Sequence, residues 1–270
     1  MRCVLIVLLL FIVSCQPDPT PFPVSIPATL IDTPSAQAAT TDTVLSVRYA
    51  LAANTAGAVP DLELIAASGQ VEQLTEPVNP ADLGTRYDII AAYGDLADGE
   101  RSPVVPHVSL ILNTDFPPFD DSVLATTLQQ ALDTRAIVIT LAIPGVSADE
   151  SDSADVLGLR TELANMGLPD GIEINAASGY APGIEAVRMT LRVAGIDTYW
   201  GVLAPELVQS AMRSGRVQVA LVMWTESRAV WETLAGEGNI IDLFSVPISY
   251  LAVDGLTITF TPYGFPLATR

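Results

Sequence analysis

The most restrictive feature of this chain is an order of strands and helices that occurs twice. The clearer copy places strands at Gly171–Ala177, Ile196–Trp200 and Val217–Trp224, with helices at Gly183–Gly195 and Ala204–Ser214 between them. The helical segments repeat apolar residues at a spacing of three and four. A strand–helix–strand–helix–strand order of this length predicts a small parallel sheet covered by helices.

The other copy lies near the start of the chain. It predicts strands at Leu45–Ala52, Val71–Thr75 and Tyr87–Tyr93, a helix at Val59–Ala67 and a short helical piece at Pro80–Leu83. Two such sheets predict an α/β protein with two lobes, each a βαβαβ-based sheet with flanking helices. Lobes joined by crossing segments enclose a cleft, where we expect a ligand to bind.

The remaining segments supply the hinge and complete the lobes. We expect a β-rich run at Val104–Asn113, a helix at Ser122–Arg135 and a short apolar strand at Ile137–Ile143. Further strands are expected at Ile240–Tyr250 and Leu256–Phe260. The last strands are predicted to return to the first lobe, because that lobe is otherwise too small to cover its sheet. Residues 44–107 with 240–270 are therefore assigned to lobe 1, and residues 108–239 to lobe 2.

The amino terminus has the pattern of an export signal, assigned to residues 1–14. One arginine precedes the apolar run Val4–Val13, which is shorter than the ~20 residues that span a bilayer as a helix. The run Ile12–Cys15 resembles a bacterial lipobox, in which Cys15 is lipidated before cleavage. Loss of Cys3 with the signal leaves one cysteine and no internal disulfide. The alternatives are an ordinary secretory signal in which Cys15 has no role, and a retained membrane helix.

Residues 15–43 are predicted to be a disordered tether. Gln16–Asp42 is rich in Pro, Thr, Ser and Ala, with six prolines and Phe22 as its one aromatic residue. Such a composition buries too little apolar surface to offset the entropy of the chain. The sequence therefore predicts a folded module anchored as a lipoprotein at the extracytoplasmic face of the cell membrane.

The charge of the chain excludes some partners. Twelve basic residues, all arginine, stand against 31 acidic ones, and the formal net charge is 12 − 31 = −19. Nucleic-acid binding requires clustered Lys and Arg, so no nucleic-acid partner is expected. Anionic lipid headgroups are also repelled, so attachment to the membrane depends on the lipid.

Three stretches resemble a known family. They are the run from Ser109, SLILNTDFPPFDDSVLATTLQQALDTRAIV, the segment Leu163–Trp224 with its MGLPDGIEI piece at Met166–Ile174, and the tail PISYLAVDGLTITFTPYGFPL. Together they extend from about Val104 to the end of the chain. This part of the chain resembles the bacterial extracellular solute-binding proteins of family 5, which serve ABC importers of the peptide and nickel type.

The resemblance implies a two-lobed periplasmic-binding-protein fold of the second type that delivers a solute to an ABC permease. Two differences stand out. Members of the peptide class are much longer and carry an additional N-terminal subdomain, so this chain is reduced in length. They also have an aspartate three residues after the tryptophan, which binds the amino terminus of the peptide. That position is Ser227 here, with Glu226 beside it. The resemblance therefore supports the fold more than it supports peptide binding.

No enzyme signature is found in the sequence. Nucleophile motifs, phosphate loops and paired Cys/His metal spacings are absent. The single histidine, His107, lies in an apolar strand and is interpreted as structural. The acidic run Asp149–Asp155 could offer oxygen ligands to Ca²⁺, but it lacks the central glycine of a calcium loop and is interpreted as a solvated turn. We expect no enzyme activity, no cofactor and no metal.

Candidate ligand residues follow from the topology. In open α/β sheets, ligands bind beyond the carboxyl ends of the strands. The residues in these positions or at the hinge are Asn54, Thr55, Tyr93, Asp95, Asn113, Ser178, Tyr180, Trp224, Glu226 and Ser227. Trp224 offers a stacking plane, or alternatively caps the core. Glu226 would neutralise a cationic ligand, or alternatively remains a surface carboxylate.

Three functions are compatible with these patterns. The leading one is a solute-binding lipoprotein that captures a small solute, a peptide or an amine-bearing molecule, in the cleft between the lobes for an ABC importer. The second is a reduced homologue that acts as an extracytoplasmic sensor or assembly lipoprotein without a transport role. The third is an extracytoplasmic enzyme on the same fold, for which no nucleophile and base are found.

Overall fold

The computed structural model describes residues 46–52, 59–74, 79–148, 154–226 and 228–269. The compact unit spans Leu45–Arg270. The predicted signal peptide, the tether and Cys15 lie outside the described residues. So do the candidate residues Asn54, Thr55 and Ser227.

The first sheet has the strand order β2-β1-β3-β11-β4. Its first three strands come from the first sequence copy and are parallel: β1 (Val47–Ala52), β2 (Gly69–Leu74) and β3 (Ile89–Tyr93). The connections contain α1 (Leu62–Ser68) and the 3-10 helix η1 (Pro80–Asp82). The antiparallel strands β11 (Ile248–Ala252) and β4 (Glu100–Arg101) complete the sheet.

The second sheet has the order β6-β10-β5-β9-β7-β8. The second sequence copy supplies the parallel strands β7 (Ile172–Gly179), β8 (Ile196–Val202) and β9 (Val219–Trp224). The other strands are β5 (His107–Leu112), β6 (Ser147–Ala148) and β10 (Ile240–Ser245). The helices of this part of the chain are α2 (Ser122–Ala131), α3 (Thr134–Leu141), α4 (Val156–Asn165), α5 (Ile184–Val193), α6 (Pro205–Arg213), α7 (Arg228–Ala235) and the 3-10 helix η2 (Glu237–Asn239).

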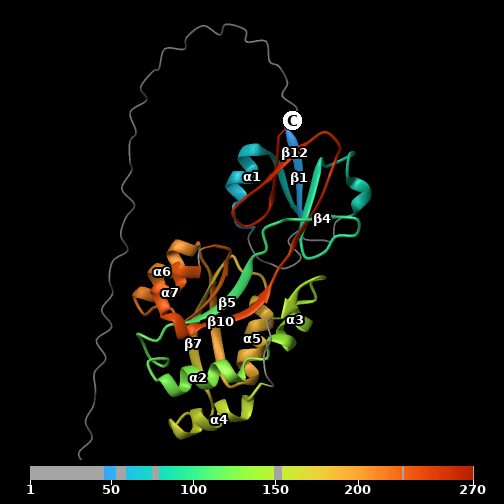
Figure 1. Cartoon of the computed structure of the whole chain (residues 1–270). Helices are drawn as coiled ribbons and strands as arrows, with labels where there is room; N and C mark the ends of the chain where they lie inside the picture. The colour runs from blue at the N-terminus through green and yellow to red at the C-terminus, as the bar shows by residue number, and fades with distance from the viewer. Residues whose placement is uncertain (1–45, 53–58, 75–78, 149–153, 227, 270) are drawn as a thin grey trace, which may run out of the picture. The chain divides into compact units, whose positions relative to one another are not determined.

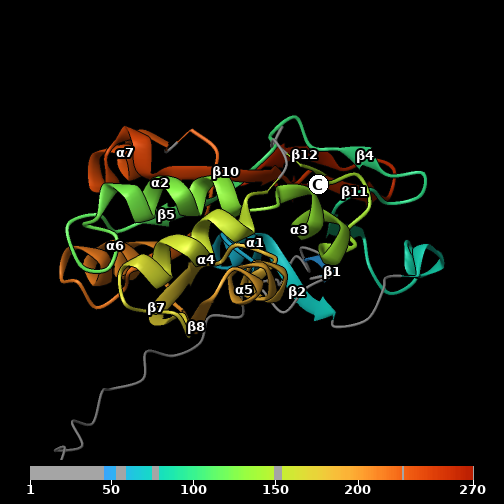
Figure 2. The ribbon, with the colours of Figure 1, turned by 90° about the horizontal axis from the view of Figure 1, so that it is seen from below.

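The two sequence copies form separate sheets with the same internal order. In each copy the first strand lies between the second and the third, as β2-β1-β3 and as β8-β7-β9. Figure 1 shows α1 and the hairpin strand β12 (Thr257–Phe260) with the first sheet, and α2, α5, α6 and α7 around the second. Figure 2 shows α2, α4 and α5 on one side of the second sheet from a second direction. The predicted α/β class, with two sheets and flanking helices, is confirmed.

The predicted strand at Ile137–Ile143 is wrong, because most of this run lies in α3. The carboxylate of Asp133 caps that helix by accepting the backbone N–H of Ala136 at 2.8 Å. Ile137 and Leu141 are buried. The run is short and apolar and contains several β-branched residues, but a cap and one buried face stabilise a helix irrespective of strand propensity.

The predicted strand Ile240–Tyr250 is two strands in different sheets. β10 pairs with β5 in the second sheet, whereas β11 pairs with β3 in the first. Val246 and Pro247 lie between them, and the N–H of Val246 bonds to Pro106 O at 2.9 Å. Residues 240–245 therefore pair within the second sheet, whereas residues 248–252 pair within the first. The assignment of whole lobes stays a prediction.

The hairpin of β12 (Thr257–Phe260) and β13 (Pro266–Thr269) packs on the first part of the chain. The N–H of Ala268 donates to the hydroxyl of Tyr49 in β1 at 2.8 Å. This bond joins the hairpin to a strand of the first sheet. Among the described residues, no helix has the length and apolar character that crossing a membrane requires.

Candidate functional site

Three strands of the second sheet place their ends at one edge. β7 and β9 are parallel, so both end there, and β5 is antiparallel to β9 and begins there. His107 lies directly opposite Trp224, and their rings stack with centroids 4.8 Å apart. His107 Nδ1 and the hydroxyl of Ser245 are 2.9 Å apart across the next strand pair. This edge is where a ligand of an open α/β sheet is expected.

The matching edge of the first sheet is the end of β3. Tyr93 lies opposite Ile248, and the N–H of Gly94 donates to Pro247 O at 2.7 Å. The chain passes between the two sheets at residues 102–106 and again at Val246–Pro247, so these segments join the two edges. We call the region of residues 93–95, 180 and 224–226 the strand-end junction.

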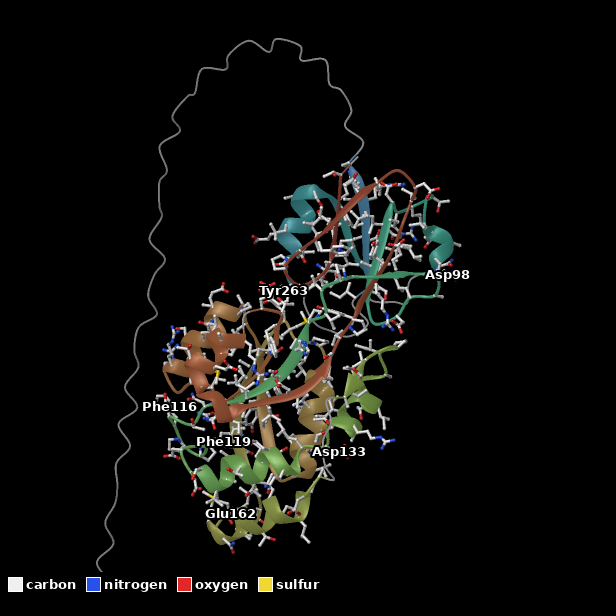
Figure 3. All side chains as sticks on the ribbon, in the orientation of Figure 1. Asp98, Phe116, Phe119, Asp133, Glu162 and Tyr263 are labelled. Carbon is white, nitrogen blue, oxygen red and sulfur yellow. The ribbon has the colours of Figure 1, made fainter. Side chains whose placement is uncertain are left out.

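Two helices begin at this junction with a carboxylate each. Asp61 is the N-cap residue of α1, and Glu206 lies in the first turn of α6. The N–H of Tyr263, in the turn between β12 and β13, is 3.4 Å from Asp61 Oδ2, and burial, then Asp61 and Glu206, raise the pKa of its hydroxyl. Figure 3 shows Tyr263 between the two sheets. Negative charge is thus concentrated where the strand ends meet.

Tyr93 and Asp95 take different roles. Tyr93 is buried and its ring meets that of Phe265 edge-to-face, with centroids 5.3 Å apart. Burial, then Tyr263 and Asp61, raise the pKa of Tyr93 far above its ordinary value, so it stays protonated. Asp95 accepts two bonds from Arg101, at 2.9 and 2.8 Å, and its backbone N–H bonds to Pro144 O. That carboxylate is already neutralised by a cation of the protein.

Ser178 is the last residue but one of β7, and Tyr180 directly follows the strand. Ser178 is fully buried and its hydroxyl donates to Ala181 O at 3.3 Å. Tyr180 has a left-handed backbone with φ of 63° and bridges to Val222 of β9. Tyr180 therefore reaches the junction beside β9, whereas Ser178 serves the turn.

Asn113 lies away from the other candidates. It follows β5, whose first residue is at the junction, and so stands at the opposite edge of the sheet. It is buried, and its amide donates to Met212 O at 2.8 Å and Val217 O at 2.9 Å. The structure gives Asn113 a role in holding the loop between α6 and β9, and not a place beside Trp224.

Trp224 is the centre of a polar and aromatic network. Its indole N–H donates to Ser109 at 2.7 Å, and Ser109 donates to Asp242 at 2.7 Å. Arg228 binds Asp242 at 2.5 Å and Glu232 at 2.7 Å, and its guanidinium lies 5.2 Å from the centroid of the indole. With 9% of its surface exposed, the ring is a core residue, so of the two readings of Trp224 the structure favours the core cap.

The carboxylate of Glu226 differs from those of Asp242 and Glu232 in its exposure and in its charge partners. Glu226 is exposed just beyond the end of β9, and within the described residues no cation pairs with it. The preceding residue, Thr225, donates its hydroxyl to Pro262 O at 3.1 Å. Glu226 therefore remains available to a ligand at the junction.

Sequence reasoning missed Asp61, Glu206 and Tyr263. A signal for the first two exists: a helix that follows a strand begins near the carboxyl end of that strand, and both residues lie at predicted helix starts. Tyr263 carries no such signal, because its place depends on how the tail folds back over the first sheet.

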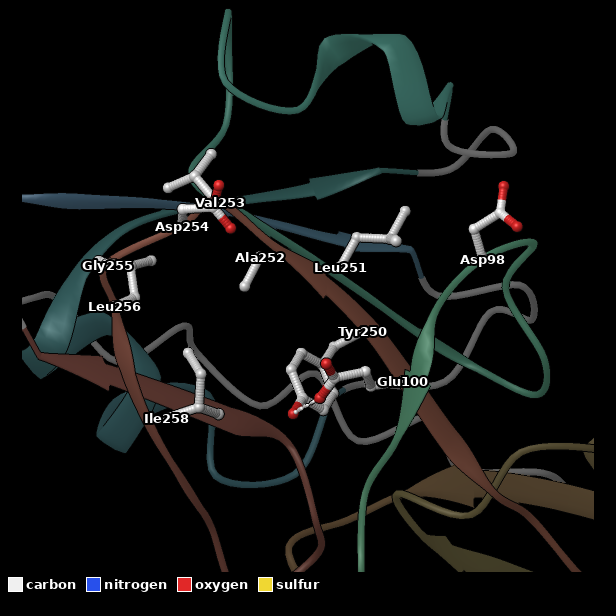
Figure 4. A pocket seen from close by; sticks show the side chains of 10 residues that line it. All are labelled: Asp98, Glu100, Tyr250, Leu251, Ala252, Val253, Asp254, Gly255, Leu256 and Ile258. Carbon is white, nitrogen blue, oxygen red and sulfur yellow. Dashed lines mark hydrogen bonds between the residues drawn. The ribbon is translucent and has the colours of Figure 1, made fainter.

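A separate cavity of about 440 Å³ lies on the first sheet, away from the predicted residues. It is lined by Asp98, Glu100, residues 250–256 and Ile258 (Figure 4). Tyr250 donates its hydroxyl at 2.7 Å to Glu100, the residue paired with it on β4. Among the described residues, no group of three or more His, Cys, Asp or Glu side chains is arranged to hold a metal ion.

The Tyr250–Glu100 pair predicts a loss of stability at alkaline pH. Burial, then the bond to Glu100, raises the pKa of Tyr250 from 10.0 to about 12. A raised pKa in the folded state stabilises the protein below pH 10, and this contribution is lost as the pH rises from 10 to 12. The full loss is roughly 2–3 kcal/mol. Urea denaturation of wild type and Tyr250→Phe across this range measures it. Equal pH dependence in both proteins would contradict the assignment.

Comparison with known proteins gives a likeness in fold. No protein-family model and no curated protein matches the chain. A substrate binding protein from Microbacterium hydrocarbonoxydans, solved with 4-hydroxybenzoate hydrazide, superposes with a TM-score of 0.53 at 12% identity, over 78% of this chain and 59% of that one.

Two further solved structures have a TM-score of 0.48 at 14% identity. Haemophilus influenzae OppA in complex with the peptide RPPGFSPFR matches 73% of this chain and 55% of its own. A dipeptide binding protein from a Pseudoalteromonas species, in complex with Met-Leu, matches 70% and 51%. The chain thus spans between half and three fifths of the length of these proteins. Its described unit has the two-lobed α/β fold of periplasmic binding proteins.

Proposed function

We propose that this chain is a solute-binding protein that captures a small solute at the strand-end junction. The observation that carries the proposal is the meeting of two separate sheets at their strand ends, through two crossing segments. The likeness in fold to a substrate binding protein at a TM-score of 0.53 supports it. Bound there, a solute would contact both sheets at once, which is how two-lobed proteins couple binding to closure.

The charge at the junction supports an amine-bearing solute, including a short peptide. Asp61, Glu206 and Glu226 bring carboxylates to it. The nearby cations are already paired, Arg101 with Asp95 and Arg228 with Asp242 and Glu232. A cationic group would therefore meet uncompensated negative charge, whereas an anion would be repelled.

The proposal includes the location and the partner. Export and lipidation at Cys15 are supported by the short apolar run and the lipobox-like residues, and delivery to an ABC permease rests on the resemblance of the chain from about Val104 onward to solute-binding proteins. We expect wild-type protein to partition into membranes and detergent, and Cys15→Ala to remain unprocessed or to be released. Fractionation with mass measurement of the amino terminus checks this, and equal partitioning with an unmodified thiol would contradict it.

The solute is tested by native mass spectrometry of protein purified without refolding, because a closed site retains its ligand. A retained amine-bearing species identifies the solute, whose affinity for stripped protein is then measured by calorimetry. Glu206→Gln and Asp61→Asn are each expected to weaken binding about tenfold, the loss typical of a charge-assisted hydrogen bond. Asp170→Asn is the matched control, because Asp170 is exposed in the turn before β7, at the opposite edge.

Two outcomes would count against the proposal. Unchanged affinity in both carboxylate variants would move the site elsewhere. Absence of any retained or bindable solute would favour the second reading, a sensor or assembly lipoprotein on the same fold.

A further inference from the structure

The turn between β12 and β13, residues 261–265, is firmly built. Thr261 N–H bonds to Phe265 O at 2.8 Å, Gly264 N–H to Thr261 O at 2.9 Å, and Phe265 N–H to the Thr261 hydroxyl at 3.1 Å. Gly264 has a φ of +89°, and a Cβ there would lie 2.8 Å from Val104 O. The turn therefore keeps its shape while it lies against the crossing segment of residues 102–106.

On the side of the first sheet the turn is held by several contacts. Phe265 is buried and packs on Tyr93, and Tyr263 N–H faces Asp61. β13, which continues from the turn, is fixed to Tyr49 by the bond from Ala268. Separating the turn from this sheet would expose an aromatic core residue to water.

Among the described residues, a single hydrogen bond joins the turn to the second sheet. The hydroxyl of Thr225, just after β9, donates to Pro262 O at 3.1 Å. Burial, then Asp61 and then Glu206 of α6, raise the pKa of the Tyr263 phenol. Both Pro262 and Thr225 are accessible to solvent, so water competes for this bond.

We propose that the turn of residues 261–265 is a gate over the strand-end junction, fixed to the first sheet and held to the second through Thr225. This regulation rests on the proposed function, because the solute would enter where the gate parts from β9. The asymmetry of the contacts carries the inference: aromatic packing on one side sets which sheet the gate follows, and one exposed hydroxyl bond on the other sets how easily it opens.

The gate is tested without any solute. Spin labels at Glu63→Cys on α1 and Ser210→Cys on α6, both exposed, with Cys3→Ser and Cys15→Ser in all proteins, report the distance between the two sides by pulsed electron resonance. Thr225→Val is expected to shift the closed-to-open ratio about two- to tenfold toward open, the range for one exposed hydrogen bond. Thr259→Val is the matched control, because its hydroxyl bonds to Leu267 O within the hairpin.

A second variant tests closure directly. Thr225→Cys with Pro262→Cys is expected to form a disulfide on mild oxidation and to narrow the distance distribution to its short component. Identical distributions for wild type and Thr225→Val, or failure of the cysteine pair to cross-link, would overturn the gate. If Thr225→Val opens as expected but no solute binds to the protein, the gate is upheld and the proposed function is contradicted. The failure of the gate and the failure of the proposed function are therefore distinguishable.

Discussion

Replacing Trp224 with alanine is expected to lower the free energy of unfolding by about 3–5 kcal/mol, the range for removing a large buried aromatic side chain. The indole is 9% exposed, stacks on His107 and donates to Ser109. Its loss leaves a cavity and removes the donor that orders the Ser109–Asp242–Arg228 chain. Urea denaturation followed by circular dichroism measures the change. The variant is expected to lose stability whether or not Trp224 contacts a solute.

Trp200→Ala is the matched control. Trp200 is only partly buried in the edge strand β8, and its indole N–H bonds to Thr198 of the same strand, so its loss should cost about 1 kcal/mol, typical of a single substitution. Should Trp224→Ala keep wild-type stability while a solute no longer binds, the tryptophan would be a ligand-stacking surface after all, and its place in the core would be contradicted.

Asn113→Ala is expected to cost about 3 kcal/mol in unfolding free energy and to leave solute affinity unchanged. The substitution leaves two buried carbonyls, Met212 O and Val217 O, without the donor that satisfies them, and each unsatisfied group costs about 1–3 kcal/mol. Denaturation and calorimetry on the same preparation separate the two effects. Asn175→Ala is the control, because Asn175 is exposed in β7.

Reduced solute affinity in Asn113→Ala, at unchanged stability, would return Asn113 to the ligand site. The sequence rule placed it there because it follows a strand. The rule fails for Asn113 because β5 runs antiparallel to β7 and β9, so its carboxyl end lies at the opposite edge. Strand direction depends on pairing across the sheet and cannot be read from the strand itself.

The repeated order of elements made the architecture predictable. Both copies alternate apolar strands with amphipathic helices, and such patterns determine local structure and parallel pairing. The division of Ile240–Tyr250 into β10 and β11 was not predictable from that pattern, because both halves are apolar. Pairing with β5 on one side and β3 on the other decides it. Tertiary contacts also decide α3, where β-branched residues occupy a capped helix.

The candidate site was predictable only in part. The rule that ligands bind at the ends of strands predicted Tyr93, Tyr180 and the region after Trp224, because these positions depend only on the local order of strands and helices. The burial of Ser178 depends on how the turn after β7 closes. The arrival of Tyr263 depends on a hairpin that follows β11. A single sequence does not show which side chains distant segments of the chain bring to a site.

Hydrogen–deuterium exchange on the protein as purified, compared with protein stripped of its solute, tests the central claim most directly. Solute bound at the strand-end junction should protect residues 61–65, 180–184, 205–209, 224–226 and 261–265 together, because these segments converge there from both sheets. Residues 113–116 should exchange equally in both samples. Protection confined to residues 98–100 and 250–258, around the cavity on the first sheet, or no difference between the samples, would contradict solute capture at the junction.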